Sequence, residues 1–138
     1  MIINSPDSGF VWIGKEMPFQ WISVSWDSGS YTGNELIAGQ YIWDMPKKNY
    51  KNIRFNDYKL NLKRTEFLNY DAWLIEGVWE TINEVESKGG PFRSYLFYDQ
   101  IKNNTYHINM LIFHPGNNKS LYIRQMDMIA RTFSFINP

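Results

Sequence analysis

Apolar and polar residues alternate in several stretches of the chain, and such alternation is typical of β-strands with one face in a core. Ile22, Val24 and Trp26 fall on one face of the clearest early example, whereas Ser23 and Ser25 fall on the other. Applied along the whole sequence, the pattern predicts strands at residues 10–13, 19–26, 62–70, 72–82, 92–99 and 105–114.

The stretch 72–82 has apolar side chains on both of its predicted faces. Trp73 and Ile75 share one face, and Ala72 and Leu74 share the other. A strand covered on both sides is typical of the middle of a sheet. We therefore predict that this strand is central.

The last two predicted strands are joined by Asn103 and Asn104, which tolerate the left-handed backbone of a tight turn. These strands therefore form a hairpin, and short connections of this kind predict an antiparallel sheet. On the second strand of the hairpin, the positions expected to face the core are Tyr106, Ile108, Met110 and Ile112.

A helix is predicted from about residue 33 to residue 44, with Thr32 or Asn34 as its N-terminal cap. Pro46 is expected to end it, and residues 46–61 are expected to form a long surface loop. The apolar stripe of this helix is predicted to consist of Leu36, Ile37, Tyr41 and Met45.

A second helix is predicted over residues 119–133, where apolar side chains recur at helical spacing. The order of elements predicts a two-layer α+β fold, a mostly antiparallel sheet with helices packed on one face, including the C-terminal helix. The length fits a single domain, 1–138, with a loose leader at residues 1–9. The stripe expected to face the sheet in the second helix is Tyr122, Met126, Ile129 and Phe133.

The composition restricts the classes of function. Acidic and basic residues number 14 each, and a zero net charge argues against a nucleic-acid partner. No cysteine is present, which excludes disulfides, cysteine-bound zinc and thiol catalysis. No apolar stretch is long enough for a transmembrane segment, and residues 1–14 lack the pattern of a signal peptide. The basic residues Lys47, Lys48, Lys51, Arg54, Lys59, Lys63 and Arg64 form either a solvated face, which we favour, or a local basic patch.

Candidate catalytic groups are few. His107 and His114 are seven residues apart on one strand and therefore point to opposite faces, so no metal site and no cofactor are predicted. Glu76 and Glu80 lie roughly 13 Å apart along their strand, which exceeds the separation of glycosidase carboxylates. Neither the serines nor Gly89-Gly90 occur in a nucleophile-elbow or phosphate-loop motif.

Six tryptophans are present, and they are expected to fill the core, with an exposed aromatic platform as the alternative. The tract Gly89-Gly90-Pro91-Phe92 is expected to be a loop that opens into a strand, because glycine permits positive φ and Pro91 extends the residue before it.

A family resemblance is carried by the tracts Gly77-Val78-Trp79-Glu80, Gly89-Gly90-Pro91-Phe92-Arg93-Ser94, 122–129, Thr132-Phe133, Phe10-Val11-Trp12-Ile13 and Tyr31-Thr32. In these tracts the chain resembles the C-terminal half of domain of unknown function 4837, a family of uncharacterised lipoproteins from Bacteroidota. The resemblance implies a cell-envelope location, on the periplasmic face of a membrane and lipid-anchored in the intact protein. It implies no catalytic residues. The signal peptide and lipid-bearing cysteine of that family are absent here, so the chain is either a fragment or a divergent member.

The sequence therefore favours a non-catalytic envelope module that binds or assembles with a protein or glycan partner. The residues expected to contribute to that surface are Trp79, Gly89, Gly90, Phe92 and Arg93. Two alternatives stay open: a hydrolase of an envelope glycan or peptide that uses Glu76 or Glu80 with His107, and a purely structural spacer.

Overall fold

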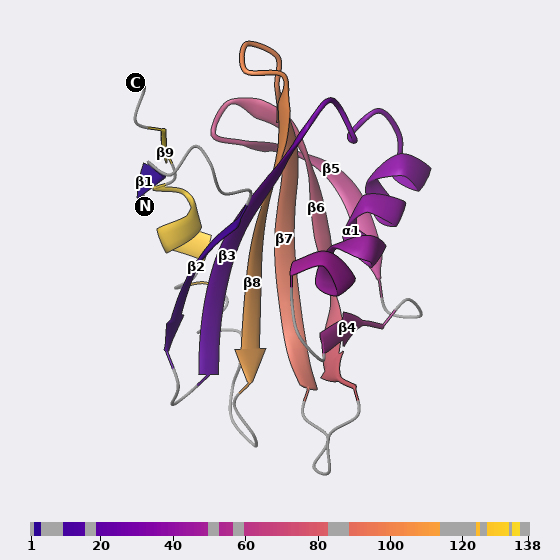
Figure 1. Cartoon of the computed structure of the whole chain (residues 1–138), viewed down its shortest axis with the longest axis vertical. Helices are drawn as coiled ribbons and strands as arrows, with labels where there is room; N and C mark the ends of the chain where they lie inside the picture. Colours follow the sequence, from indigo (N-terminus) through magenta and orange to yellow (C-terminus); the bar gives the residue numbers. More distant parts are fainter. Residues whose placement is uncertain are drawn as a thin grey trace.

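Long antiparallel strands make up most of the fold (Figure 1). The computed structural model describes residues 2–3, 10–15, 19–49, 53–56, 60–82, 89–113, 124, 127–132 and 134–135. Its elements are β1 (Ile2–Ile3), β2 (Phe10–Lys15), β3 (Phe19–Ser28), α1 (Glu35–Asn49), β4 (Ile53–Phe55), β5 (Asn61–Phe67), β6 (Tyr70–Thr81), β7 (Gly89–Asp99), β8 (Asn104–Phe113) and β9 (Ser134–Phe135). A helical turn covers residues 127–130.

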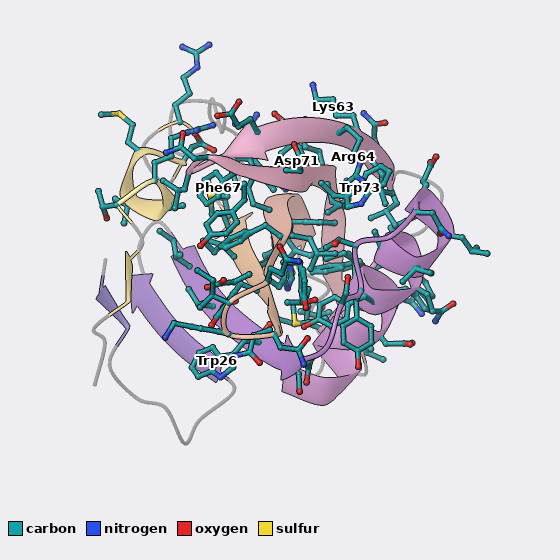
Figure 2. The ribbon with its side chains drawn as sticks, turned by 90° about the horizontal axis from the view of Figure 1, so that it is seen from above. Trp26, Lys63, Arg64, Phe67, Asp71 and Trp73 are labelled. Atoms are coloured by element: carbon teal, nitrogen blue, oxygen red, sulfur yellow. The ribbon has the colours of Figure 1, made fainter. Side chains whose placement is uncertain are left out.

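One sheet contains seven of the strands, in the order β2-β3-β8-β7-β6-β4, and β5 also pairs with β6. Every pairing in it is antiparallel, as the sequence predicts. β6 is an interior strand, because β7 occupies one of its edges while β5 and β4 share the other, but it lies second from the end of the strand order and not at the predicted centre. Seen from above, the sheet curls into a half-barrel (Figure 2).

The two faces of the sheet carry separate apolar clusters, because successive side chains of a strand point to opposite sides. The predicted alternation is confirmed in β3, β6 and β8. Figure 2 shows Phe67 on the side of the C-terminal helical turn and Trp73 on the side of α1. The first cluster contains Ile22, Val24, Phe67, Ala72, Leu74, Tyr95, Phe97, Tyr106, Ile108, Met110, Ile112 and Ala130. The second contains Ala38, Ile42, Met45, Phe55, Trp73, Ile75, Trp79, Phe92, Leu96 and Leu111.

α1 begins at Glu35, just after the predicted start at about residue 33, and Asn34, one of the two predicted caps, is its cap. The amide N–H of Ile37 donates to Oδ1 of Asn34 at 2.9 Å, which satisfies a donor that the first turn leaves without a helical partner. The predicted end is wrong, since the helix continues through Pro46 to Asn49. Proline removes one intrahelical hydrogen bond, and the burial of Met45 in the second cluster keeps this end against the sheet.

The predicted stripe of α1 is correct for Met45, which is buried, and for Tyr41, which packs against the second cluster, but it is wrong for Leu36 and Ile37. Ala38, Ile42 and Met45 are the buried side chains, whereas Leu36 is 82 % exposed and Ile37 is 43 % exposed. The spacing of four and three residues is retained, but the contact face is rotated toward small Ala38. The helix can approach the large rings of Trp73 and Phe55 more closely with alanine there.

The C-terminal helical turn lies on the other face of the sheet, because Ala130 packs in the first cluster while α1 packs in the second. The expectation that both helices share one face is therefore not confirmed. Ile129 was predicted to be buried, but it is 47 % exposed and its neighbour Ala130 takes the inward position. Tyr122, Met126 and Phe133 lie outside the described residues.

Two connections differ from the prediction. The stretch 62–70 is not one strand, since β5 ends at Phe67 and both Leu68 and Asn69 have positive φ, 51° and 69°. This pair of left-handed residues makes the tight turn into β6. The predicted loop 46–61 contains the end of α1 and β4, and the leader contains β1, which pairs in parallel with β9.

Candidate functional site

A pocket of about 320 Å³ opens between α1 and the end of β3. This volume falls in the range of small-ligand sites. The rings of Tyr31 and Tyr41 lie 5.2 Å apart, centroid to centroid, and we call the site the tyrosine pocket. The residues that line it are Asp27, Tyr31, Ile37, Gln40, Tyr41, Asp44 and Met45.

Tyr41 is fixed in the wall of this pocket by Asp27. Its hydroxyl donates to Oδ2 of Asp27 at 2.8 Å. Burial raises the pKa of the Tyr41 hydroxyl far above its ordinary value, and the hydrogen bond to Asp27 raises that pKa further. Tyr41 is therefore a permanent neutral donor, and its ring keeps one orientation.

His107 lies directly behind Tyr41. The two rings meet edge to face, with centroids 6.2 Å apart and an interplanar angle of 88°. His107 is fully buried, and neither ring nitrogen has a hydrogen-bond partner among the described residues. Burial lowers the pKa of His107 to about 3, so the imidazole is neutral at physiological pH.

The connection from β3 to α1 is bonded to β8 through Thr105. The Thr105 hydroxyl donates to the carbonyl oxygen of Gly29 at 2.7 Å and accepts the amide N–H of Tyr31 at 3.0 Å. Gly29 has a φ of 96°, a conformation that favours glycine. These contacts hold Tyr31 beside α1.

A second, shallower hollow of about 610 Å³ lies on the other side of α1. Gln40 lines both this hollow and the tyrosine pocket. Ile37 lines the tyrosine pocket and Leu36 lines the hollow, and both expose their apolar side chains; we call these two residues together with Gln40 the outer face of α1. The hollow is lined by Glu35, Leu36, Gly39, Gln40, Trp43, Leu60 and Leu62.

At the opposite end of the sheet, Trp79 and Gly90 form a tightly packed unit. The indole Nε1 of Trp79 donates to the carbonyl oxygen of Ile112 at 2.9 Å. A Cβ at Gly90 would lie 2.0 Å from that same oxygen, so any side chain at this position is excluded. Gly89 and Gly90 are already paired with β6, which corrects the expected loop, and neither has positive φ. Both positions require glycine, because the backbone of β6 lies too close to Gly89, and the backbone of β8 too close to Gly90, for a side chain to fit.

Arg93 points to the other face, where it belongs to an ionic network. Its guanidinium Nη2 lies 3.0 Å from a carboxylate oxygen of Glu76, its direct partner across β6 and β7. Nη1 of Arg93 lies 3.7 Å from Asp127, which also binds Arg131 at 2.8 Å and accepts the hydroxyl of Tyr95 at 2.5 Å. The network attaches the C-terminal helical turn to the sheet.

Comparison with known proteins decides the family. A family model described as a domain of unknown function (DUF4837) matches residues 1–132. The chain belongs to the DUF4837 family. No curated protein matches it.

The fold of this DUF4837 chain also occurs in a solved structure. The crystal structure of a protein of unknown function, PA94 from Pseudomonas aeruginosa, aligns with a TM-score of 0.56 over 97 % of this chain and 87 % of that one. The sequences are 8 % identical, so the likeness shows the fold alone.

In the structure of this DUF4837 chain, the five residues predicted to form a binding surface do not all lie on one face of the sheet. Trp79 and Phe92 are each 2 % exposed, and Phe92 stacks on Phe55. Trp79 and Phe92 lie together on the α1 side, whereas Arg93 lies on the other side. A binding role for this group stays a prediction, and its buried aromatic rings offer little surface to a partner.

The carboxylates of the hydrolase alternative do not converge with a histidine. Glu76 pairs with Arg93, Glu80 pairs with Arg54 at 3.0 Å, and both belong to the face of β6 opposite His107. His114 lies outside the described residues. Within the described part of the chain, no three side chains of the His, Cys, Asp and Glu types are grouped to hold a metal ion.

Two of the basic residues considered for a basic patch make contacts within the protein. Arg64 stacks over the ring of Trp73 at 4.5 Å, and Arg54 is paired with Glu80, so these two candidates for a basic patch have intramolecular partners. In the part of the chain that the structure describes, no helix has the length and apolarity needed to cross a bilayer.

The tyrosine pocket was missed by sequence reasoning. Its walls come from the end of β3, the following connection and α1, and strand or helix periodicity does not indicate which of these meet. One feature of the sequence pointed to an exposed apolar surface on this helix. Leu36 and Ile37 fit helical spacing as well as Ala38 and Ile42 do, and only one of the two pairs can face the sheet.

Proposed function

We propose that this DUF4837 chain is a non-catalytic binding module of the cell envelope that holds a protein or glycan partner against the outer face of α1. One observation carries the proposal: Leu36 and Ile37 expose apolar side chains, each at the edge of a hollow that Gln40 also lines, although the core contacts of α1 are already made by other residues. Contiguous exposed apolar surface of this kind marks interaction sites. The apolar character favours a protein partner over a glycan.

The envelope location is the part of the proposal that rests on the resemblance to lipoproteins. In the intact protein a lipid anchor would hold the domain at a membrane surface, where the module meets its partner. A hydrolase receives no comparable support, because Glu76 and Glu80 are each paired with an arginine and lie across the sheet from His107.

The proposal is tested with three baits in envelope extracts of a bacterium that carries this protein. The baits are the wild type, a Leu36→Ser/Ile37→Ser double variant and a Met128→Ser control. Met128 is 71 % exposed on the C-terminal helical turn, so the control removes a comparable apolar group from the opposite face of the sheet.

We expect a partner that the wild type and Met128→Ser retain and that the double variant loses. The purified partner should then bind the wild type directly, and digestion with protease or glycosidase identifies its class. Equal recovery by all three baits, with unchanged thermal unfolding of each, would reject the outer face of α1 as the binding surface.

A further inference from the structure

We infer that the tyrosine pocket binds a cationic group, the ammonium or guanidinium of a lysine or arginine side chain in the partner. The inference deepens the proposed function and rests on it, because it names the group that enters beside the outer face of α1. The argument depends on the two rings, on the charges and on the apolar floor of the pocket.

The two rings supply one part of the recognition. Tyr31 is 38 % exposed and its ring is tilted by 32° from that of Tyr41, at 5.2 Å between centroids. A cation within about 6 Å of an aromatic ring is attracted by the negative ring face. Tyr41 is held by Asp27 and backed by His107, so this wall is formed before a ligand arrives.

The charges of the pocket favour the same ligand. Asp27 and Asp44 both line it, and none of the described residues that line it is basic. The Asp44 carboxylate accepts one hydrogen bond, from Nε2 of Gln40 at 3.0 Å, and a carboxylate has acceptor positions for more. A cation in the pocket would therefore meet charge-assisted acceptors.

The apolar lining suits a long side chain better than an isolated ion. Ile37 and Met45 contribute apolar surface beside the two rings, and Met45 is buried. Lysine and arginine bury their aliphatic stems on such surface while the charged end meets polar groups. Gln40 borders both hollows. A partner segment that places an apolar residue against the outer face of α1 would therefore bring a neighbouring basic residue to the tyrosine pocket.

The test is an NMR titration of the ¹⁵N-labelled full chain with four probes. N-acetyl-lysine methylamide carries the cation, N-acetyl-norleucine methylamide is its neutral counterpart, butylammonium is a free amine, and methyl N-acetylglucosaminide represents glycans. We expect amide shifts within residues 27–45 for the lysine probe and not for the norleucine probe. Asp44→Asn should weaken lysine binding about threefold to tenfold, whereas Asp71→Asn, in the β5–β6 hairpin and outside the pocket lining, should leave it unchanged.

Tighter binding of the lysine probe than of butylammonium would assign the pocket to a side chain, and equal binding would assign it to free amines; both outcomes support a cation site. Equal shifts with the norleucine probe, binding of the glucosaminide alone, or an unchanged affinity in Asp44→Asn would overturn it. The proposed function is judged separately, because retention of a partner through Leu36 and Ile37 does not require a cation in the pocket.

Discussion

The indole nitrogen of Trp79 donates to the carbonyl oxygen of Ile112 at 2.9 Å, and this bond joins two strands that are not neighbours. β6 and β8 are separated by β7, which they both pair with, so the bond crosses β7 at Gly90. Because Gly90 has no side chain, the ring of Trp79 can lie flat over the intervening strand. The Gly-Gly tract is thus explained by packing, without any reference to a ligand.

Gly90→Ala should destabilise the protein by about 2–4 kcal/mol, because the new Cβ would lie 2.0 Å from the carbonyl oxygen of Ile112. Urea unfolding followed by tryptophan fluorescence measures the change. Gly39→Ala is the matched control: its Cβ would meet only Leu62 at 3.7 Å, and alanine in a helix stabilises by up to about 1 kcal/mol. Similar losses in both variants would contradict this account of the tract.

The free energy of unfolding should fall as the pH falls below 6.5, because of His107. The folded protein holds the pKa of this imidazole at about 3, against an ordinary value of 6.5, so the unfolded chain binds a proton that the folded chain does not. The loss approaches about 1.4 kcal/mol per pH unit. Urea titrations between pH 7 and pH 5 measure the slope.

His107→Gln should have a smaller slope over the same pH range, since glutamine does not titrate. All other titrating groups are common to both proteins and cancel in the comparison. Identical slopes would show that His107 is not held neutral by burial.

Tyr41→Phe should destabilise the protein by about 1–2 kcal/mol, because the carboxylate of Asp27 loses a donor at 2.8 Å in a partly buried site. Tyr98→Phe removes a hydroxyl bonded to Asn103 at 2.6 Å in an exposed site, where water replaces it. We expect less than about 0.5 kcal/mol for this control. Thermal unfolding compares the two, and an equal cost would indicate that Asp27 does not fix Tyr41.

Asp127→Asn should cost about 1–3 kcal/mol, because Asp127 binds Arg131 at 2.8 Å and Tyr95 at 2.5 Å while its side chain is only 15 % exposed. Asp71→Asn is the control. Asp71 is exposed and lies directly across from Glu66 in the β5–β6 hairpin, so its neutralisation removes a like-charge pair and should be neutral or slightly stabilising. Guanidinium unfolding of both variants gives the difference.

The strands could be predicted from the sequence because alternation is a local property. The inward faces of β3, β6 and β8 were each correct, and β6 is an interior strand with neighbours on both edges, although it lies second from the end of the strand order. The turn at Leu68 and Asn69 was missed, because leucine seldom adopts positive φ; in the structure Leu68 packs against the first cluster.

The helices were harder to predict because their contact face depends on the partner surface. Leu36 and Ile37 satisfy helical periodicity as well as Ala38 and Ile42 do, and only the rings beneath α1 select the smaller residue. The sequence also did not indicate which aromatic residues line a pocket. Trp79 and Phe92 were selected as conspicuous aromatic residues, but they are buried in the second cluster, where Phe92 stacks on Phe55, while the tyrosines that line a pocket lie ten residues apart.

Thr105 connects the tyrosine pocket to β8, a strand that lies far from the pocket residues in the sequence. It bonds to Gly29 and Tyr31 across sequence separations of 76 and 74 residues. Contacts between such distant residues form late, because closing a long loop costs chain entropy before the contact compensates for it. A nascent or truncated chain that lacks β8 therefore lacks the contacts that hold Tyr31 beside α1, so the tyrosine pocket is complete only after β8 has joined the sheet.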